Sequence, residues 1–225
     1  MTTRSTLAQK LRCLMTAVSI VLLLPAASGV AGGAYPDSTA APAGNVPWEF
    51  SVGGYLYTLP FDDDILIAVA IAQHGSLHLE ARYNYEDLKT GSAFVGWTFS
   101  MGETFTAALT PMAGVAFGRT TGIVPALEAE LGYGIADFYL ESEYLIDLDE
   151  REWSFFYTWL ELGVSPGDLF RVGLSAQRTR LFQTPLELDR GLFVELTPDV
   201  GAVSLYAFNV FTDNWFMVIS ARVDW

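Results

Sequence analysis

Cysteine is almost absent from this chain. Its one cysteine, Cys13, lies at the start of an N-terminal apolar run and not at its end, a position that argues against a lipid-modified N-terminus. Once that segment is removed, no thiol remains for a disulfide, for catalysis or for metal binding. We therefore expect a protein without disulfides, metal or cofactor.

Basic residues are also scarce. The 225 residues include 12 lysines and arginines against 26 aspartates and glutamates, a formal net charge of −14. Three of the basic residues, Arg4, Lys10 and Arg12, precede the N-terminal apolar run, so a chain without them carries 9 against 26, or −17. Such a balance argues against nucleic acid as a partner.

After the N-terminal run, no long hydrophobic segment is present. The chain is 51% hydrophobic and 14% aromatic, with a mean hydropathy of +0.30, yet no later segment approaches the ~20 apolar residues of a membrane helix. A transmembrane β-barrel reconciles the two observations, because each strand needs only ~10 residues and turns every second one to lipid. We expect one such domain.

The N-terminus is typical of an export signal. Positive residues precede an apolar run from Cys13 to Pro25, and small residues follow. This pattern predicts a cleaved signal peptide over residues 1–28, a flexible periplasmic leader over 29–46 and the barrel over 47–225.

From Trp48 onward, segments that alternate apolar and polar residues follow one another with turn signals between them. They predict an all-β, antiparallel up-and-down barrel of about twelve strands, with longer acidic loops outside and compact turns inside. The expected strands are 48–57, 64–73, 76–86, 92–101, 105–117, 122–133, 137–147, 153–164, 169–182, 190–197, 202–210 and 214–225. A soluble β-sandwich or lipocalin-like barrel shows the same alternation, but soluble filled barrels usually stop near eight strands.

Aromatic residues lie where the two rims of such a barrel are expected. Tyr83 and Tyr85 fall at the outer end of the third predicted strand, and Trp215 and Trp225 enclose the apolar face of the last. These positions predict aromatic girdles at the membrane interfaces.

The last strand ends Val218-Ile219-Ser220-Ala221-Arg222-Val223-Asp224-Trp225. Together with the export signal and the alternation, it resembles bacterial outer-membrane β-barrel proteins of the porin-like class. The resemblance implies an outer-membrane location, contact with lipid and lipopolysaccharide, and recognition of the C-terminal strand by the barrel-assembly machinery. Trp225 stands where that class more often has Phe.

Strand parity directs a set of mostly acidic side chains into the lumen. The candidates are His78, Glu80, Arg82, Glu128, Glu130, Glu141, Glu143, Tyr157, Trp159, Glu161 and Arg171. A hydrated belt of this charge favours small cationic or neutral solutes, so we expect a narrow passive channel and no enzyme. Two alternatives stay open: a closed structural or interaction barrel without transport, and a membrane-embedded hydrolase built on His78.

Two arginines break the parity of the ninth predicted strand. Arg178 and Arg180 share its outward face with apolar residues, near the outer rim. They predict contact with lipopolysaccharide phosphates. The alternatives are a β-bulge that turns them inward and simple snorkelling of the side chains to the interface.

Overall fold

The computed structural model describes residues 46–60, 62–179 and 187–225. The expected signal peptide and, apart from Val46, the expected leader lie outside these residues. No helix in the described ranges is long and apolar enough to span a membrane. The elements are β1 (Trp48–Thr58), β2 (Ile65–His74), β3 (Leu77–Tyr83), β4 (Thr90–Trp97), β5 (Phe99–Met101), β6 (Phe105–Gly118), β7 (Gly122–Tyr133), β8 (Ala136–Asp147), the 3₁₀ turn η1 (Arg151–Trp153), β9 (Phe155–Gly167), β10 (Phe170–Thr179), β11 (Glu187–Leu196), β12 (Gly201–Phe208) and β13 (Phe216–Asp224).

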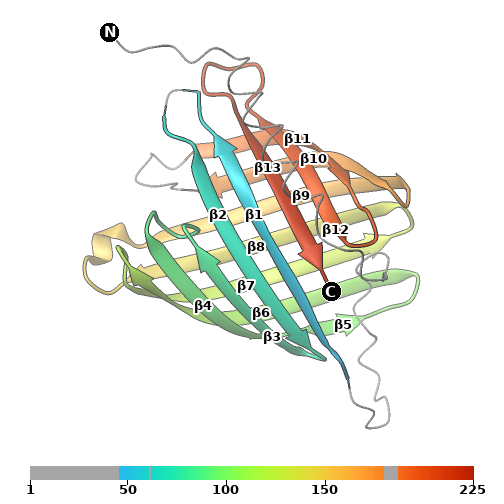
Figure 1. Ribbon diagram of the computed structural model, residues 1–225, viewed down its shortest axis with the longest axis horizontal. Coiled ribbons are helices and arrows are strands. Elements are labelled where there is room, and N and C mark those ends of the chain that lie inside the picture. Colours follow the sequence, from blue (N-terminus) through green and yellow to red (C-terminus); the bar gives the residue numbers. More distant parts are fainter. Residues whose placement is uncertain (1–45, 61, 180–186) are drawn as a thin grey trace.

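These strands form one closed antiparallel barrel (Figure 1). Both β4 and β5 pair with β6, so they are one strand interrupted at Thr98, and the barrel has twelve strands. It closes where β1 pairs with β13, from Ser51 opposite Asp224 to Thr58 opposite Met217. The predicted all-β, twelve-stranded up-and-down barrel is confirmed.

The connections follow the predicted alternation. Compact turns join β2 to β3, β5 to β6, β7 to β8, β9 to β10 and β11 to β12, at the same end as the two barrel termini. In the first of them Gly75 has a φ of +57°, a left-handed conformation that glycine adopts without steric cost. Most connections at the opposite end are longer, so in an outer membrane that end faces the cell exterior.

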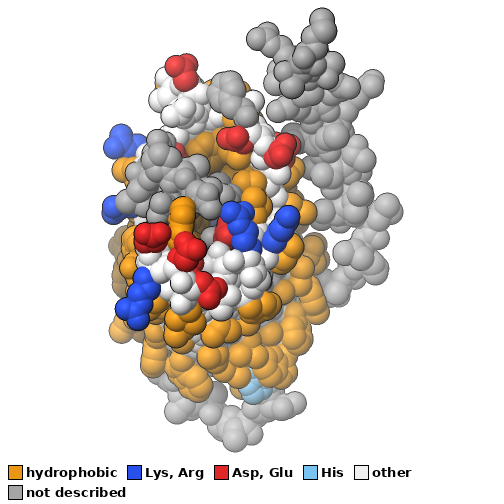
Figure 2. All heavy atoms as spheres, turned by 90° about the vertical axis from the view of Figure 1, so that its left-hand side faces the viewer, with side chains coloured by type: hydrophobic (Ala, Val, Ile, Leu, Met, Phe, Trp, Pro, Cys, Tyr) orange, Lys and Arg blue, Asp and Glu red, His pale blue; other side chains and the backbone are white. Residues whose placement is uncertain are grey.

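The wall of the barrel is inside out relative to a soluble protein. Outward residues such as Leu66 and Leu174 are 63% and 56% exposed, whereas the inward Arg82 and Glu143 are 4% and 2% exposed. Hydrophobic side chains cover the wall, and charged ones gather at the loop end (Figure 2). A soluble barrel would bury the apolar face, so this arrangement excludes that alternative and fits a lipid-facing wall.

The lumen is not polar throughout, and it holds more apolar residues than the mostly acidic set that strand parity predicts. The inward residues of β2 include Ile65, Ile67, Val69 and Ile71. Their outward neighbours are also apolar, for example Leu66 and Ala68, so both faces of β2 are hydrophobic. Aliphatic and aromatic side chains therefore fill part of the lumen.

Candidate channel lumen

An arginine and three carboxylates bridge the lumen between β3 and β8, which are separated in the sheet by β4, β6 and β7. Arg82 contacts Glu80 on its own strand (Nε–Oε1 2.8 Å) and two residues of β8, Glu141 (Nη1–Oε1 2.8 Å) and Glu143 (Nη1–Oε2 2.8 Å). The Arg82 side chain is fully buried and the Glu143 side chain 1% exposed. The guanidinium carbon of Arg82 also lies 4.5 Å from the ring centroid of Phe94.

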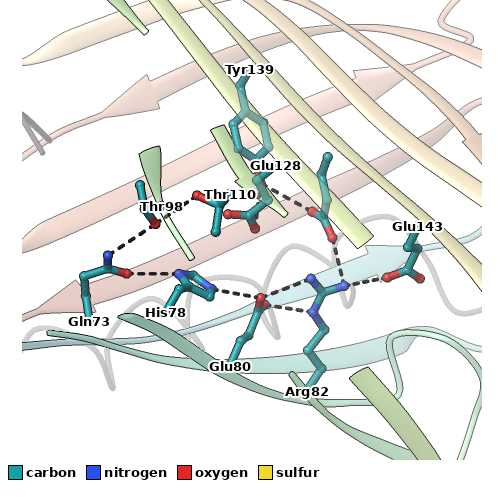
Figure 3. A network of polar contacts seen from close by, with 10 residues as sticks. Gln73, His78, Glu80, Arg82, Thr98, Thr110, Glu128, Tyr139 and Glu143 are labelled. Carbon is teal, nitrogen blue, oxygen red and sulfur yellow. Dashed lines mark hydrogen bonds and ion pairs between the residues drawn. The ribbon is translucent and has the colours of Figure 1, made fainter. Parts of the chain in front are cut away.

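Further hydrogen bonds extend this bridge into a continuous network, which we call the Arg82 network (Figure 3). On one side His78 is 3.4 Å from Glu80 and 3.1 Å from Gln73, and Gln73 reaches Thr98 and through it Thr110. Because one ring nitrogen of His78 faces Gln73 and the other faces Glu80, this histidine has the contacts of a structural link. The hydrolase alternative gains no support from them.

On the other side the network ends at β7. The hydroxyl of Tyr139 lies 3.4 Å from Glu141 and 3.4 Å from Glu128. Glu130 is the next inward residue of β7. If Glu80, Glu141 and Glu143 are all ionised, they and Arg82 carry a formal charge of −2, and Glu128 adds to it.

A second group of charges lies nearer the inner end of the lumen. Arg171 on β10 donates to Asp137 on β8 (Nε–Oδ1 2.8 Å) and to Glu161 on β9 (Nη1–Oε2 2.6 Å), and Glu195 on β11 is 3.6 Å away. The predicted polar residues therefore form two groups on different parts of the wall and not one continuous belt.

Aromatic side chains occupy the lumen beside these charges. The aromatic cluster consists of Tyr57, Tyr157, Trp159, Phe193, Tyr206, Phe208 and Phe216, packed with Ile65, Ile67 and Val218. Trp159 and Tyr206 both donate to Glu161 (2.9 and 2.8 Å), which joins this cluster to Arg171. Tyr157 and Trp159, which strand parity directs into the lumen, belong to this cluster. Sequence reasoning missed its other members.

Several contacts of the aromatic cluster, and of Tyr55 which packs against it, cross the lumen. Tyr55 on β1 faces Trp159 on β9 with ring centroids 6.5 Å apart, although β10 to β13 lie between these strands. The hydroxyl of Tyr57 is 3.4 Å from Gln177 on β10. In this structure, therefore, side chains from opposite walls of the barrel touch inside the lumen.

The predicted girdle residues divide into two groups. Tyr83, Trp215 and Trp225 are 51%, 41% and 60% exposed, as a lipid-interface position requires. Tyr85 does not belong to the girdle: it points into the lumen, 4.3 Å from the Arg82 guanidinium and with its hydroxyl 3.4 Å from that of Tyr157. The reason is that β3 ends at Tyr83 and Asn84 has a φ of +61°, so the strand alternation stops there.

The same connection buries a carboxyl group. Glu86 is 3% exposed and accepts a 2.6 Å hydrogen bond from Ser92 through Oε1, while its Oε2 lacks a hydrogen-bond partner among the described residues. Burial raises the pKa of Glu86 above its ordinary value, although Arg82 acts in the opposite direction. No group of three or more potential metal ligands is present in the described ranges.

Arg178 points outward and is exposed. The pairing of β10 with both neighbours runs without interruption from Val172 to Arg178, so no bulge turns this side chain inward. Arg180 lies outside the described residues.

The closed sheet, the apolar wall and the charged lumen define a transmembrane β-barrel with a porin-like fold. The fold is similar to the KdgM porin, with a TM-score of 0.56 at 7% sequence identity over 78% of this chain and 98% of that protein. It is equally similar to the KdgM porin in complex with disordered oligogalacturonate, with a TM-score of 0.57, the same identity and the same coverage. The outer membrane protein Omp33 of Acinetobacter baumannii matches with a TM-score of 0.44 at 11% identity, covering 81% of this chain and 100% of Omp33. No family model and no curated protein matches the chain.

Proposed function

We propose that this barrel is a narrow, passive outer-membrane channel that prefers cations. The observation that carries the proposal is the excess of carboxylates where the lumen is bridged, since Glu80, Glu141 and Glu143 surround a single arginine, Arg82. Carboxylates that line a low-dielectric passage attract cations and repel anions. Small cationic or neutral solutes are therefore the proposed cargo.

The contacts across the lumen set the size of this passage. Twelve strands spaced ~4.8 Å and tilted ~40° enclose a backbone radius of about 12 Å, but side chains from opposite walls meet within it. Conduction requires the Arg82 bridge or the neighbouring aromatic contacts to part. We therefore propose a low conductance with resolved open and closed levels.

A polyanion is a poor cargo for such a lumen. The KdgM porin has been solved with oligogalacturonate, a chain of carboxylate-bearing sugars. The carboxylates around Arg82 would repel this kind of molecule, so we do not extend that ligand to the present barrel.

A second candidate function is a closed barrel that stabilises the membrane or contacts other proteins without transport. The contact of Tyr55 with Trp159 favours it, as do Phe208 and Val218, which have no exposed surface in the interior of the barrel. Conductance separates the two functions.

The test is single-channel recording in planar bilayers, with a salt gradient to measure the reversal potential. The channel proposal expects discrete steps and a cation-selective potential that Glu141→Gln with Glu143→Gln reduces. A matched control, Glu103→Gln with Asp199→Asn, removes the same charge from exposed inner turns and should change little. If the folded wild-type barrel gives no steps, the channel proposal is wrong and the closed barrel is supported.

A further inference from the structure

The arginines inside the described strands separate into two kinds. Arg82, Arg171 and Arg222 point into the lumen, and each lies within 4 Å of at least one carboxylate oxygen. Arg178 on β10 and Arg190 on β11 point outward and are exposed. Neither makes an ion pair with any residue of the described part of the chain.

The register brings these two outward arginines together. Arg178 lies opposite Leu188, and Arg190 lies opposite Ala176, so the arginines are diagonal neighbours on the same face of adjacent strands. Diagonal neighbours in an antiparallel pair are roughly 7–8 Å apart, which two arginine side chains can span to hold one anion. Like charges this close repel each other until an anion neutralises them.

Their surroundings determine what kind of anion can reach them. Toward the inner end, the outward residues of the same two strands are Leu174, Ala176 and Leu192, all on the lipid-facing wall. Toward the outer end, β10 finishes at Thr179. On β11 the apolar Leu188, which lies opposite Arg178, is on the outer side of Arg190. The pair therefore lies near the outer end of the wall, where an acyl chain would cover the apolar residues and its headgroup would lie beside the guanidinium groups.

We propose that Arg178 and Arg190 form a binding site for the phosphate of an outer-leaflet lipid, namely the phosphorylated headgroup of lipopolysaccharide. Guanidinium groups bind phosphate oxygens through charge-assisted, often bidentate hydrogen bonds. The site rests on the outer-membrane location of the barrel but not on conduction. It adds Arg190, which the sequence did not indicate, and it does not depend on Arg180.

The experiment measures binding of lipid A to the detergent-solubilised full-length barrel. Three probes are compared: phosphorylated lipid A, enzymatically dephosphorylated lipid A and inorganic phosphate. The test variant is Arg178→Gln with Arg190→Gln. The control is Arg119→Gln with Arg151→Gln, which removes the same charge from exposed positions in the outer connections.

The proposal expects the wild type to bind phosphorylated lipid A at least tenfold more tightly than the test variant or the dephosphorylated lipid. The control variant should bind as the wild type does. Any of three results would overturn the site. These are an equal loss of lipid A affinity in both variants, an affinity that does not depend on the lipid phosphates, and an affinity for inorganic phosphate equal to that for lipid A. The two proposals fail separately, because a barrel without conductance can still bind this lipid, and the test variant should conduct as the wild type does.

Discussion

Arg82 offers the sharpest test of how the lumen works. Replacing it by methionine keeps most of the side-chain length but removes the one positive charge among Glu80, Glu141 and Glu143. With all three carboxylates ionised, the formal charge of the group changes from −2 to −3, and the bridge between β3 and β8 is lost. Both changes should favour the passage of cations.

The magnitudes follow from burial and distance. Even at the dielectric constant of bulk water, a unit charge ~5 Å from a permeating ion contributes about 0.8 kcal/mol, or about fourfold in local cation concentration. Because the Arg82 side chain has no exposed surface, removing one partner of this buried group should also cost about 3–5 kcal/mol of stability. Arg82→Met should therefore conduct more, select cations more strongly and unfold more readily.

The assay is the reversal potential in a salt gradient at low ionic strength, with the heat-dependent gel shift confirming a folded barrel. Arg222→Met is the matched control, since Arg222 is also a lumen arginine paired with a carboxylate, Asp224, but its side chain is 57% exposed. It should change selectivity much less. A folded Arg82→Met barrel with an unchanged reversal potential, or equal shifts in both variants, would refute the reasoning.

Three further predictions concern the interior and its supports. Trp159→Ala should raise conductance and lower the free energy of unfolding by about 3–5 kcal/mol, whereas Trp215→Ala, at an exposed rim position, should leave conductance unchanged in bilayer recordings. Because the pKa of Glu86 is raised, the folded barrel retains a proton that the unfolded chain has lost, so stability should fall as pH rises above the ordinary pKa of 4.5. In unfolding by guanidinium chloride, the free energy of unfolding of Glu86→Gln should depend less on pH than that of the wild type. A Cβ added at Gly114 would overlap the ring of Phe94 on β4, so Gly114→Ala should cost about 1–3 kcal/mol in the same unfolding assay. Gly167→Ala, whose added Cβ would have nothing within 4 Å, should cost much less.

Strand number and the direction of most charged side chains were predictable from the sequence, because period-2 alternation is a local property. In β3 the alternation His78, Glu80, Arg82 against Leu77, Leu79, Ala81 assigns each face directly. Alternation fails where both faces are apolar, as on β2. The aromatic cluster was missed for a similar reason, since Phe193 and Tyr206 are flanked by the apolar Leu192 and Leu205.

The partners across the lumen were not predictable. Arg82 and Glu143 are 61 residues apart in sequence, and Tyr57 and Gln177 are 120 apart. Which side chains meet depends on strand tilt and stagger around the closed barrel, which no local pattern encodes. Tyr85 was misassigned because β3 ends at Tyr83, three residues earlier than expected, where a single left-handed residue, Asn84, stops the alternation.

The long sequence separation of the lumen contacts has a consequence for how the barrel is built. A hairpin formed early can pair its own backbone, but it cannot pair Arg82 with Glu143, and the first and last strands meet only when the chain is complete. Until then an open sheet in lipid would present unpaired edge groups and unpaired charges, each of which is costly there. The joining of β1 to β13 therefore satisfies the backbone and encloses the ion pairs in one event, and assembly should proceed with the acidic interior kept in water until that last seam forms.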